Sequence, residues 1–161
     1  MNKYVFFRTD RIGDFLMSSI LFKSIKNSDT KSKITIIASK KNFEYIKNVE
    51  FVDEVILFPE NFIQKFLFYL KFFLKKYYLV GILDGKKRSI YFSFIVRSKY
   101  KFLFTYKKFY YLSLKFLYTR IFLDENCTSK FDEIKTLLNY IGCSFAEQNL
   151  NTISYEKVNN F

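Results

Sequence analysis

Residues 8–14, which read Arg8-Thr9-Asp10-Arg11-Ile12-Gly13-Asp14, join two apolar segments of different periodicity. Residues 4–7 form a continuous apolar run that fits a buried strand, and residues 15–27 change to the spacing of a helix. Ligands of open parallel sheets bind beyond the carboxyl ends of the strands, where loops of this kind lie. Two acids and two arginines in this short loop are more charge than a connector needs. We therefore interpret it as the active-site loop.

Strand and helix patterns alternate along the rest of the chain. Strands are predicted at 34–38, 54–58, 78–84 and 101–104, and helices at 40–48, 61–76, 88–98 and 130–141, with Gly142 as the residue that ends the last helix. Residues 106–122 are basic, aromatic and mostly helical by pattern. The alternation predicts an α/β fold, a Rossmann-like parallel sheet with helices on both faces. We expect one such domain over residues 1–143, followed by a polar tail over 144–161.

The composition excludes several classes of protein. Half of the residues are hydrophobic and 22% are aromatic, as in a chain that folds around a core. There is no histidine, and the two cysteines, Cys127 and Cys143, match no metal or redox spacing, so we predict no metal site and two reduced cytosolic thiols. Charges interrupt every apolar run, which argues against a secretory signal and a membrane span. A cytoplasmic location is expected.

The net charge of +12 allows more than one explanation. Nucleic acid, an anionic membrane surface and a phosphorylated ligand would each attract such a chain. The abundance of Lys, Asn, Ile, Phe and Tyr, with few Gly and Pro, also fits AT-rich coding without any partner. Because no RNA-binding motif is present, nucleic acid is disfavoured as a partner.

The loops rule out three common chemistries. The first loop has one glycine, and neither a Gly-x-Gly-x-x-Gly dinucleotide fingerprint nor a Walker phosphate loop occurs. Ser-His-Asp catalysis is impossible without histidine, and no Gly-x-Ser-x-Gly elbow is present. What remains is acid–base chemistry by a carboxylate, with arginine or lysine binding anions. No cofactor is predicted.

The order and spacing of four sequence segments are more specific for a protein family than any one segment alone. They are residues 8–14 with the helix that follows, residues 33–38, Val52-Asp53-Glu54-Val55-Ile56-Leu57-Phe58, and residues 78–84 followed by Arg88-Ser89. Together they resemble glycosyltransferase family 9, the family of ADP-heptose:lipopolysaccharide heptosyltransferases. The resemblance covers about residues 3–104, and residues 130–142 show a weaker resemblance.

This resemblance implies a GT-B architecture, in which two Rossmann-like domains enclose the active site. Residues 1–143 would be the N-terminal, acceptor-side domain, and residues 144–161 would lie at the interdomain junction. The family transfers heptose or a related sugar from a nucleotide-sugar to lipopolysaccharide core, with inversion and usually without a metal. The expected acceptor is a lipid-linked glycan. A nucleotide-sugar donor would need a C-terminal domain or a partner chain, so we expect the chain alone to be inactive, whether it is a fragment, half of a split enzyme or a degenerate module.

The resemblance also implies roles for individual residues. Inversion needs a general base, and the aspartate of the family's Gly-Asp pair corresponds to Asp14. Asp14 would equally suit a helix cap, and both roles can hold together. The candidate acceptor-binding residues are Arg8, Asp10, Arg11, Gly13, Asp84 and Arg88. Arg8 and Arg11 could instead form surface ion pairs with Asp10, and Asp84-Gly85 fits a turn.

The basic aromatic helices at 61–76 and 106–122 have two interpretations. Their Phe and Tyr residues could belong to the core, or lysines beside an exposed aromatic edge could contact an anionic bilayer. The second reading would place the protein peripherally at the inner face of the plasma membrane. The alternative to the enzymatic function is therefore a non-enzymatic basic module that binds anionic membrane or nucleic acid.

Overall fold

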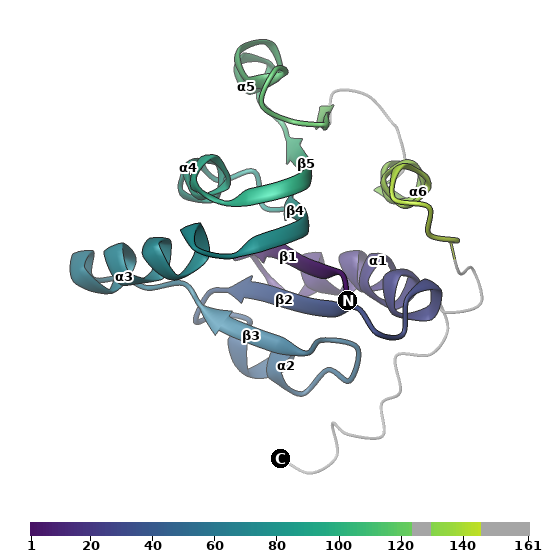
Figure 1. Cartoon of the computed structure of the whole chain (residues 1–161), viewed down its shortest axis with the longest axis horizontal. Helices are drawn as coiled ribbons and strands as arrows, with labels where there is room; N and C mark the ends of the chain where they lie inside the picture. The colour runs from purple at the N-terminus through teal and green to yellow at the C-terminus, as the bar shows by residue number, and fades with distance from the viewer. Residues whose placement is uncertain (124–129, 146–161) are drawn as a thin grey trace.

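One six-stranded parallel sheet with helices on both faces makes up the computed structural model, which describes residues 1–123 and 130–145 (Figure 1). The strands are β1 (Lys3–Arg8), β2 (Lys33–Ala38), β3 (Glu54–Leu57), β4 (Lys76–Ile82), β5 (Arg97–Thr105) and β6 (Arg120–Leu123). The helices are α1 (Ile12–Ser28), α2 (Phe43–Lys47), α3 (Phe62–Phe73), α4 (Lys87–Ile95), α5 (Lys108–Leu114) and α6 (Lys130–Tyr140). The strand order is β3-β2-β1-β4-β5-β6, and every pair is parallel. The predicted Rossmann-like α/β fold is confirmed.

The sheet separates two aromatic cores. Helices α1, α2 and α6 cover one face, and α3, α4 and α5 pack on the other. On the second face Phe92 of α4 is fully buried, and its ring centroid lies 4.5 to 6.0 Å from those of Phe7, Phe68, Tyr69 and Phe72. Alternate residues of β1 enter the two cores, which explains why residues 4–7 read as a continuous apolar run.

The prediction for residues 106–122 was wrong in its second half. Helix α5 ends at Leu114, and residues 120–123 form the edge strand β6, which pairs with β5. Similarly, α4 ends at Ile95 and β5 begins at Arg97, inside the segment predicted as helix. Short apolar runs fit a helix or a strand equally by pattern, and here pairing with an existing strand decides between them.

Gly142 terminates helix α6, as predicted. Gly142 has a φ of 71°, the left-handed conformation of a helix C′ residue, and the N–H of Cys143 bonds to the Leu138 carbonyl at 2.9 Å. Cys143 is buried, and burial raises the pKa of its thiol. The predicted thiol at Cys127 lies outside the described residues, as does all of the predicted polar tail beyond residue 145.

The strand order determines where a ligand can lie. Strand β1 is followed in the chain by β2 on one side of it, whereas β4 is added on the other side. The loops after β1 and β4 therefore lead in opposite directions, and ligands of such sheets bind between loops of this kind. These are the loops that contain residues 8–14 and 83–89. The fold therefore brings the two charged segments together at one edge of the sheet.

Candidate active site

Arg8 is the buried anchor of the loop between β1 and α1. Its Nη1 donates to the Leu83 carbonyl at 2.6 Å, and its Nε donates to the Asp14 carbonyl at 2.9 Å. Nη2 donates to the same Asp14 carbonyl. Burial lowers the pKa of the Arg8 guanidinium, while Asp10, Asp14 and Asp84 oppose that shift. Arg8 thus ties the start of α1 to the end of β4, and the predicted surface ion pair is a buried one.

Asp10 is the partner of Arg8. Its Oδ2 lies 3.1 Å from Arg8 Nη1, whereas its buried Oδ1 has no hydrogen-bond partner within the described part of the chain. Burial raises the pKa of Asp10, and the charge of Arg8 lowers it in part. Asp10 is therefore part of the buried support of this loop, with one oxygen paired to Arg8.

Asp14 occupies the first turn of α1. One carboxylate oxygen accepts a hydrogen bond from the N–H of Arg11 at 3.3 Å. Asp14 thus caps the helix from its third position, within a helix that begins at Ile12, and not from just before the helix as predicted. The other carboxylate oxygen, Oδ1, lies 3.9 Å from Arg8 Nη2. The side chain is 49% exposed. Asp14 therefore caps the helix and still presents its carboxylate to solvent.

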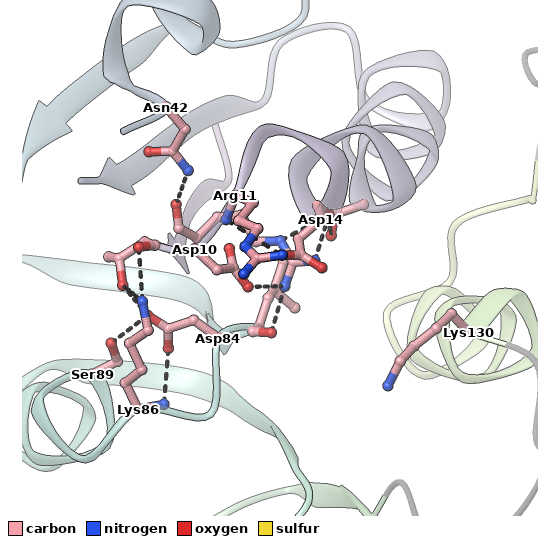
Figure 2. A network of polar contacts seen from close by, with 12 residues as sticks. Asp10, Arg11, Asp14, Asn42, Asp84, Lys86, Ser89 and Lys130 are labelled. Carbon is pink, nitrogen blue, oxygen red and sulfur yellow. Dashed lines mark hydrogen bonds and ion pairs between the residues drawn. The ribbon is translucent and has the colours of Figure 1, made fainter. Parts of the chain in front are cut away.

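A second polar network joins the loop after β1 to the loop after β4 (Figure 2). Asp84 accepts hydrogen bonds from Thr9 Oγ1 at 2.5 Å, Ser89 Oγ at 2.8 Å and the N–H of Lys86 at 3.2 Å. The last of these confirms the predicted turn at Asp84-Gly85. Lys86 Nζ donates to the Thr9 carbonyl at 2.8 Å, and Arg88 Nη2 donates to Thr9 Oγ1 at 2.9 Å. Thr9 is thus held from three sides.

The loop after β2 completes this edge of the sheet. Asn42 is buried, and its Nδ2 donates to the Arg8 carbonyl at 2.7 Å, while its Oδ1 accepts from the N–H of Ser39 at 3.0 Å. Three loops from neighbouring strands are therefore cross-linked around Arg8 and Thr9. Such cross-linking holds a charged loop in one conformation before any ligand arrives.

A cavity of about 90 Å³ opens beside this network. It lies between α1, the ends of β4 and β5, and α6, with Asp14 and Ser18 on one side and Tyr106 and Lys130 on the other. Lys130 Nζ lies 3.4 Å from Glu133 Oε2 and 5.3 Å from the centre of the Tyr106 ring. Figure 2 shows Lys130 on α6 facing the cluster from across this space. A carboxylate and a lysine thus face each other across a partly apolar cavity, which suits a polar, anionic ligand.

The predicted residues do not all meet in the cavity. Arg8 and Asp14 line it, and Asp10 and Asp84 lie behind it in the network. Arg11 and Gly13 are exposed at the start of α1, and a side chain at Gly13 would meet nothing within 4 Å. Arg88 stacks on the Phe58 ring at 4.9 Å, on the β3 side. Their roles toward an acceptor stay predictions.

Sequence reasoning missed several residues of the site. They are Asn42, Lys86, Ser89, Tyr106 and Lys130. Tyr106 follows β5 directly, so the rule that strand ends share one edge of a sheet could have found it. Lys130 comes from α6, which no local pattern placed next to α1. No group of three or more metal-ligating side chains occurs within residues 1–123 and 130–145, and no helix there is long and apolar enough to cross a membrane.

Comparisons with known proteins agree with this geometry at the level of fold. No protein-family profile matches the sequence, and no curated protein does. Among solved structures, Escherichia coli heptosyltransferase WaaC with ADP superposes with a TM-score of 0.67 at 14% identity, over 90% of this chain and 48% of that one. The chain has the fold of the N-terminal half of a GT-B glycosyltransferase.

Two further GT-B structures support the same statement. The glycosyltransferase family 9 protein of Veillonella parvula DSM 2008 matches with a TM-score of 0.65 at 14% identity, over 89% of this chain and 42% of its own. The E. coli ADP-heptose lipopolysaccharide heptosyltransferase II matches with a TM-score of 0.53 at 16% identity, over 65% and 30%. The chain thus spans about half, or less, of the length of each of these proteins. The likeness covers a GT-B half and not a whole GT-B enzyme.

Proposed function

We propose that the chain is the acceptor-side half of a glycosyltransferase. It would act in the transfer of heptose or a related sugar from a nucleotide-sugar to lipopolysaccharide core or a similar glycan, with a donor-binding half supplied from outside these 161 residues. The observation that carries the proposal is the place of Asp14: a half-exposed carboxylate on the wall of a cavity, at the ligand-binding edge of a GT-B half.

The position of Asp14 suits a general base. In an inverting transfer the acceptor hydroxyl gives its proton to the base as its oxygen attacks the anomeric carbon. The bond to the nucleoside diphosphate breaks on the opposite side. The N–H of Arg11 holds one oxygen of Asp14, which leaves Oδ1 to take the proton. Arg8 fixes the backbone of Asp14, so the carboxylate is oriented before the acceptor binds.

The surroundings of Asp14 favour an acceptor with hydroxyl and anionic groups. The half-exposed carboxylate of Asp14 can accept a hydrogen bond from a sugar hydroxyl. Lys130 brings positive charge to the opposite side of the cavity, which suits a carboxylate or phosphate on the glycan. The leaving nucleoside diphosphate would be stabilised by the other half.

Sugar transfer by Asp14→Asn tests the proposal. Asparagine still accepts the hydrogen bond from Arg11, so the cap should survive while the base is lost. In an enzyme assembled with a donor-binding half, such as the C-terminal domain of one of the structural relatives, the rate should fall by at least ~10²-fold. Asp132→Asn, the same change in the first turn of α6, is the matched control and should stay near the wild-type rate.

Two results would overturn the proposal. One is an assembled Asp14→Asn enzyme that transfers sugar as fast as the wild type. The other is sugar transfer from a nucleotide-sugar by the isolated chain, because this half would then contain a donor site as well. Thermal unfolding of each variant shows whether a lost rate reflects chemistry or a lost fold.

A further inference from the structure

Helix α3 is apolar on two opposite sides. Phe68 and Phe72 are buried against the sheet. Seven other apolar residues in and just after the helix are 45 to 84% exposed: Phe62, Ile63, Phe66, Leu67, Leu70, Phe73 and Leu74. At 3.6 residues per turn they cover roughly 140° of the helix surface, centred opposite the buried side. The core of this chain therefore does not account for them.

The neighbouring helices extend this apolar surface. Helices α3, α4 and α5 pack on the same face of the sheet (Figure 1). On α4, Tyr91 and Phe94 are exposed, and α5 has no buried residue at all. The segment from residue 109 to residue 117 adds five exposed side chains: Phe109, Tyr111, Leu112, Phe116 and Leu117. So many exposed apolar side chains on the helices of one sheet face indicate a binding surface. We call the exposed apolar residues of α3 with Leu74, of α4 and of residues 109–117 the outer face.

The positive charge of the chain is concentrated in the same segment. Residues 61–123 contain 14 Lys and Arg and one acid, Asp84, whereas the other 98 residues contain 13 basic and 14 acidic residues. AT-rich coding would spread lysine along the whole chain and would not remove acids from one segment. The coincidence of exposed apolar side chains and excess lysine thus needs an explanation beyond composition.

The outer face is built to lie on a membrane rather than to cross it. Helix α3 has 12 residues, too few for the ~20 that a span requires. A helix with an exposed apolar stripe and flanking lysines binds in the interface plane, with its apolar side between headgroups and acyl chains. Lysines beside it gain from anionic headgroups. Both properties are present here together.

We propose that the outer face docks on an anionic lipid bilayer. Its aromatic and aliphatic side chains enter the headgroup boundary, and Lys75 and Lys115 are among the lysines that contact lipid phosphates. A second copy of the chain is a poorer occupant, because it would set two strongly basic segments face to face. Six of its exposed side chains are Leu or Ile, which gain from acyl chains and offer nucleic acid no stacking surface, so lipid is preferred although aromatic side chains are also present.

Docking in this orientation holds the site near the bilayer without covering it. Helices α3, α4 and α5 each follow a strand of the parallel sheet, so they begin at the edge where Arg8 and Asp14 lie. The cavity opens on the α1 and α6 side of the sheet, so a membrane-held outer face would leave it uncovered for a glycan that extends from its lipid. The inference goes beyond the proposed function, and its test requires no sugar transfer.

Vesicle flotation of the full chain tests the inference. Binding is compared for phosphatidylcholine vesicles with and without about one third phosphatidylglycerol, and binding to the anionic vesicles is expected. Phe66→Ser/Phe73→Ser should lower the partition coefficient at least tenfold, and Ile63→Ser/Leu70→Ser is a second pair on the same stripe. Because all four side chains are exposed, the fold should persist in thermal unfolding.

Charge variants complete the experiment. Lys75→Glu/Lys115→Glu should lower binding at least tenfold, since each lysine near an anionic surface contributes to attraction. Lys41→Glu/Lys47→Glu makes the same charge change on exposed residues outside the outer face and should change binding little.

Four results would overturn the proposal. One is no binding to anionic vesicles at low salt. Another is vesicle binding that neither Phe66→Ser/Phe73→Ser nor Ile63→Ser/Leu70→Ser weakens, because the chain would then bind by electrostatic attraction alone. A third is a wild-type dimer in light scattering that Phe66→Ser/Phe73→Ser dissociates, which assigns the face to a second copy. The fourth is tighter binding to an RNA oligomer than to the anionic vesicles.

Discussion

Replacing Arg8 by methionine tests what holds the loop between β1 and α1 in place. The guanidinium donates to the carbonyls of Leu83 and Asp14 and pairs with Asp10 at 3.1 Å. Methionine fills much of the same volume and has no donor. The variant therefore removes the polar contacts of Arg8 without opening a large cavity.

The structure gives a magnitude for this change. Removing one partner of a buried ion pair lowers the free energy of unfolding by about 3–5 kcal/mol. The lower end applies here, because the Asp10 side chain is 21% exposed and the Asp14 carbonyl keeps its bond from Ser18 Oγ. We expect a loss of about 3 kcal/mol in urea unfolding, which corresponds to a Tm lower by about 6–12 °C for a chain of this size.

The loss should depend on pH through Asp10. Burial raises the pKa of Asp10 and Arg8 opposes that rise, so the folded-state pKa rises further in Arg8→Met. The folded state then binds the proton more tightly than the unfolded chain, whose pKa is about 3.9. Stability falls as the pH rises through the window between these two values. Arg8→Met should therefore lose less stability near the bottom of that window than at pH 7.

A double-mutant cycle and a control make the result specific. Asp10→Asn in the Arg8→Met background should recover about 1–2 kcal/mol, because the unpaired carboxylate is gone. Arg11→Met, at the exposed arginine three residues away, should change stability by no more than about 0.5 kcal/mol. The reasoning is refuted if Arg8→Met loses less than about 1 kcal/mol, or if Asp10→Asn recovers nothing.

Three other substitutions test a turn, a helix end and the core beside α4. Gly85→Ala should lower the free energy of unfolding in urea by about 2 kcal/mol, because φ is 57° and the new Cβ would lie 2.9 Å from the Phe104 carbonyl oxygen. Gly142→Ala should lower it by only about 1 kcal/mol, because φ is 71° but the space around the new Cβ is open. A larger loss for Gly142→Ala than for Gly85→Ala would contradict this explanation. Tyr118→Phe removes a buried hydrogen bond to Ser93 at 2.5 Å and should destabilise by about 1 kcal/mol. Burial raises the pKa of Tyr118 to about 12. The stability that the neutral phenol contributes is therefore complete below the ordinary tyrosine pKa and is lost as the pH rises through about 12. An ultraviolet titration in which Tyr118→Phe shows the same absorbance step near pH 12 as the wild type would be inconsistent with this assignment.

The sheet could be predicted from the sequence because its strands are buried on both faces. Residues 4–7 are a continuous apolar run and residues 34–38 are largely β-branched, and each segment ends where polar residues begin a loop. The edge strand β6 could not be predicted. Its four residues follow a long aromatic segment, and only pairing with β5 decides that they are extended. The end of α4 escaped prediction for the same reason.

The sequence predicted the residues of the loop after β1, but it missed the site residues that come from other loops and helices. Residues 8–14 contain their charges in one loop, so a local pattern was enough to find them. Asn42, Ser89 and Lys130 come from other loops and helices and reach the site only through the tertiary fold. The sequence also overestimated the freedom of Arg8, whose donors are used within the protein. Burial, which decides between a ligand contact and an anchor, cannot be read from a seven-residue stretch.

An NMR titration of the isotope-labelled full chain tests the central claim most directly. The probes are a deacylated lipopolysaccharide core oligosaccharide and ADP. An acceptor-side half predicts saturable shifts with the oligosaccharide in residues 8–18, 83–86 and 104–106, which surround the cavity, and no saturable shift with ADP. Saturable binding of ADP at these residues, or no response to the oligosaccharide, would contradict the assignment of this chain as the acceptor-side half.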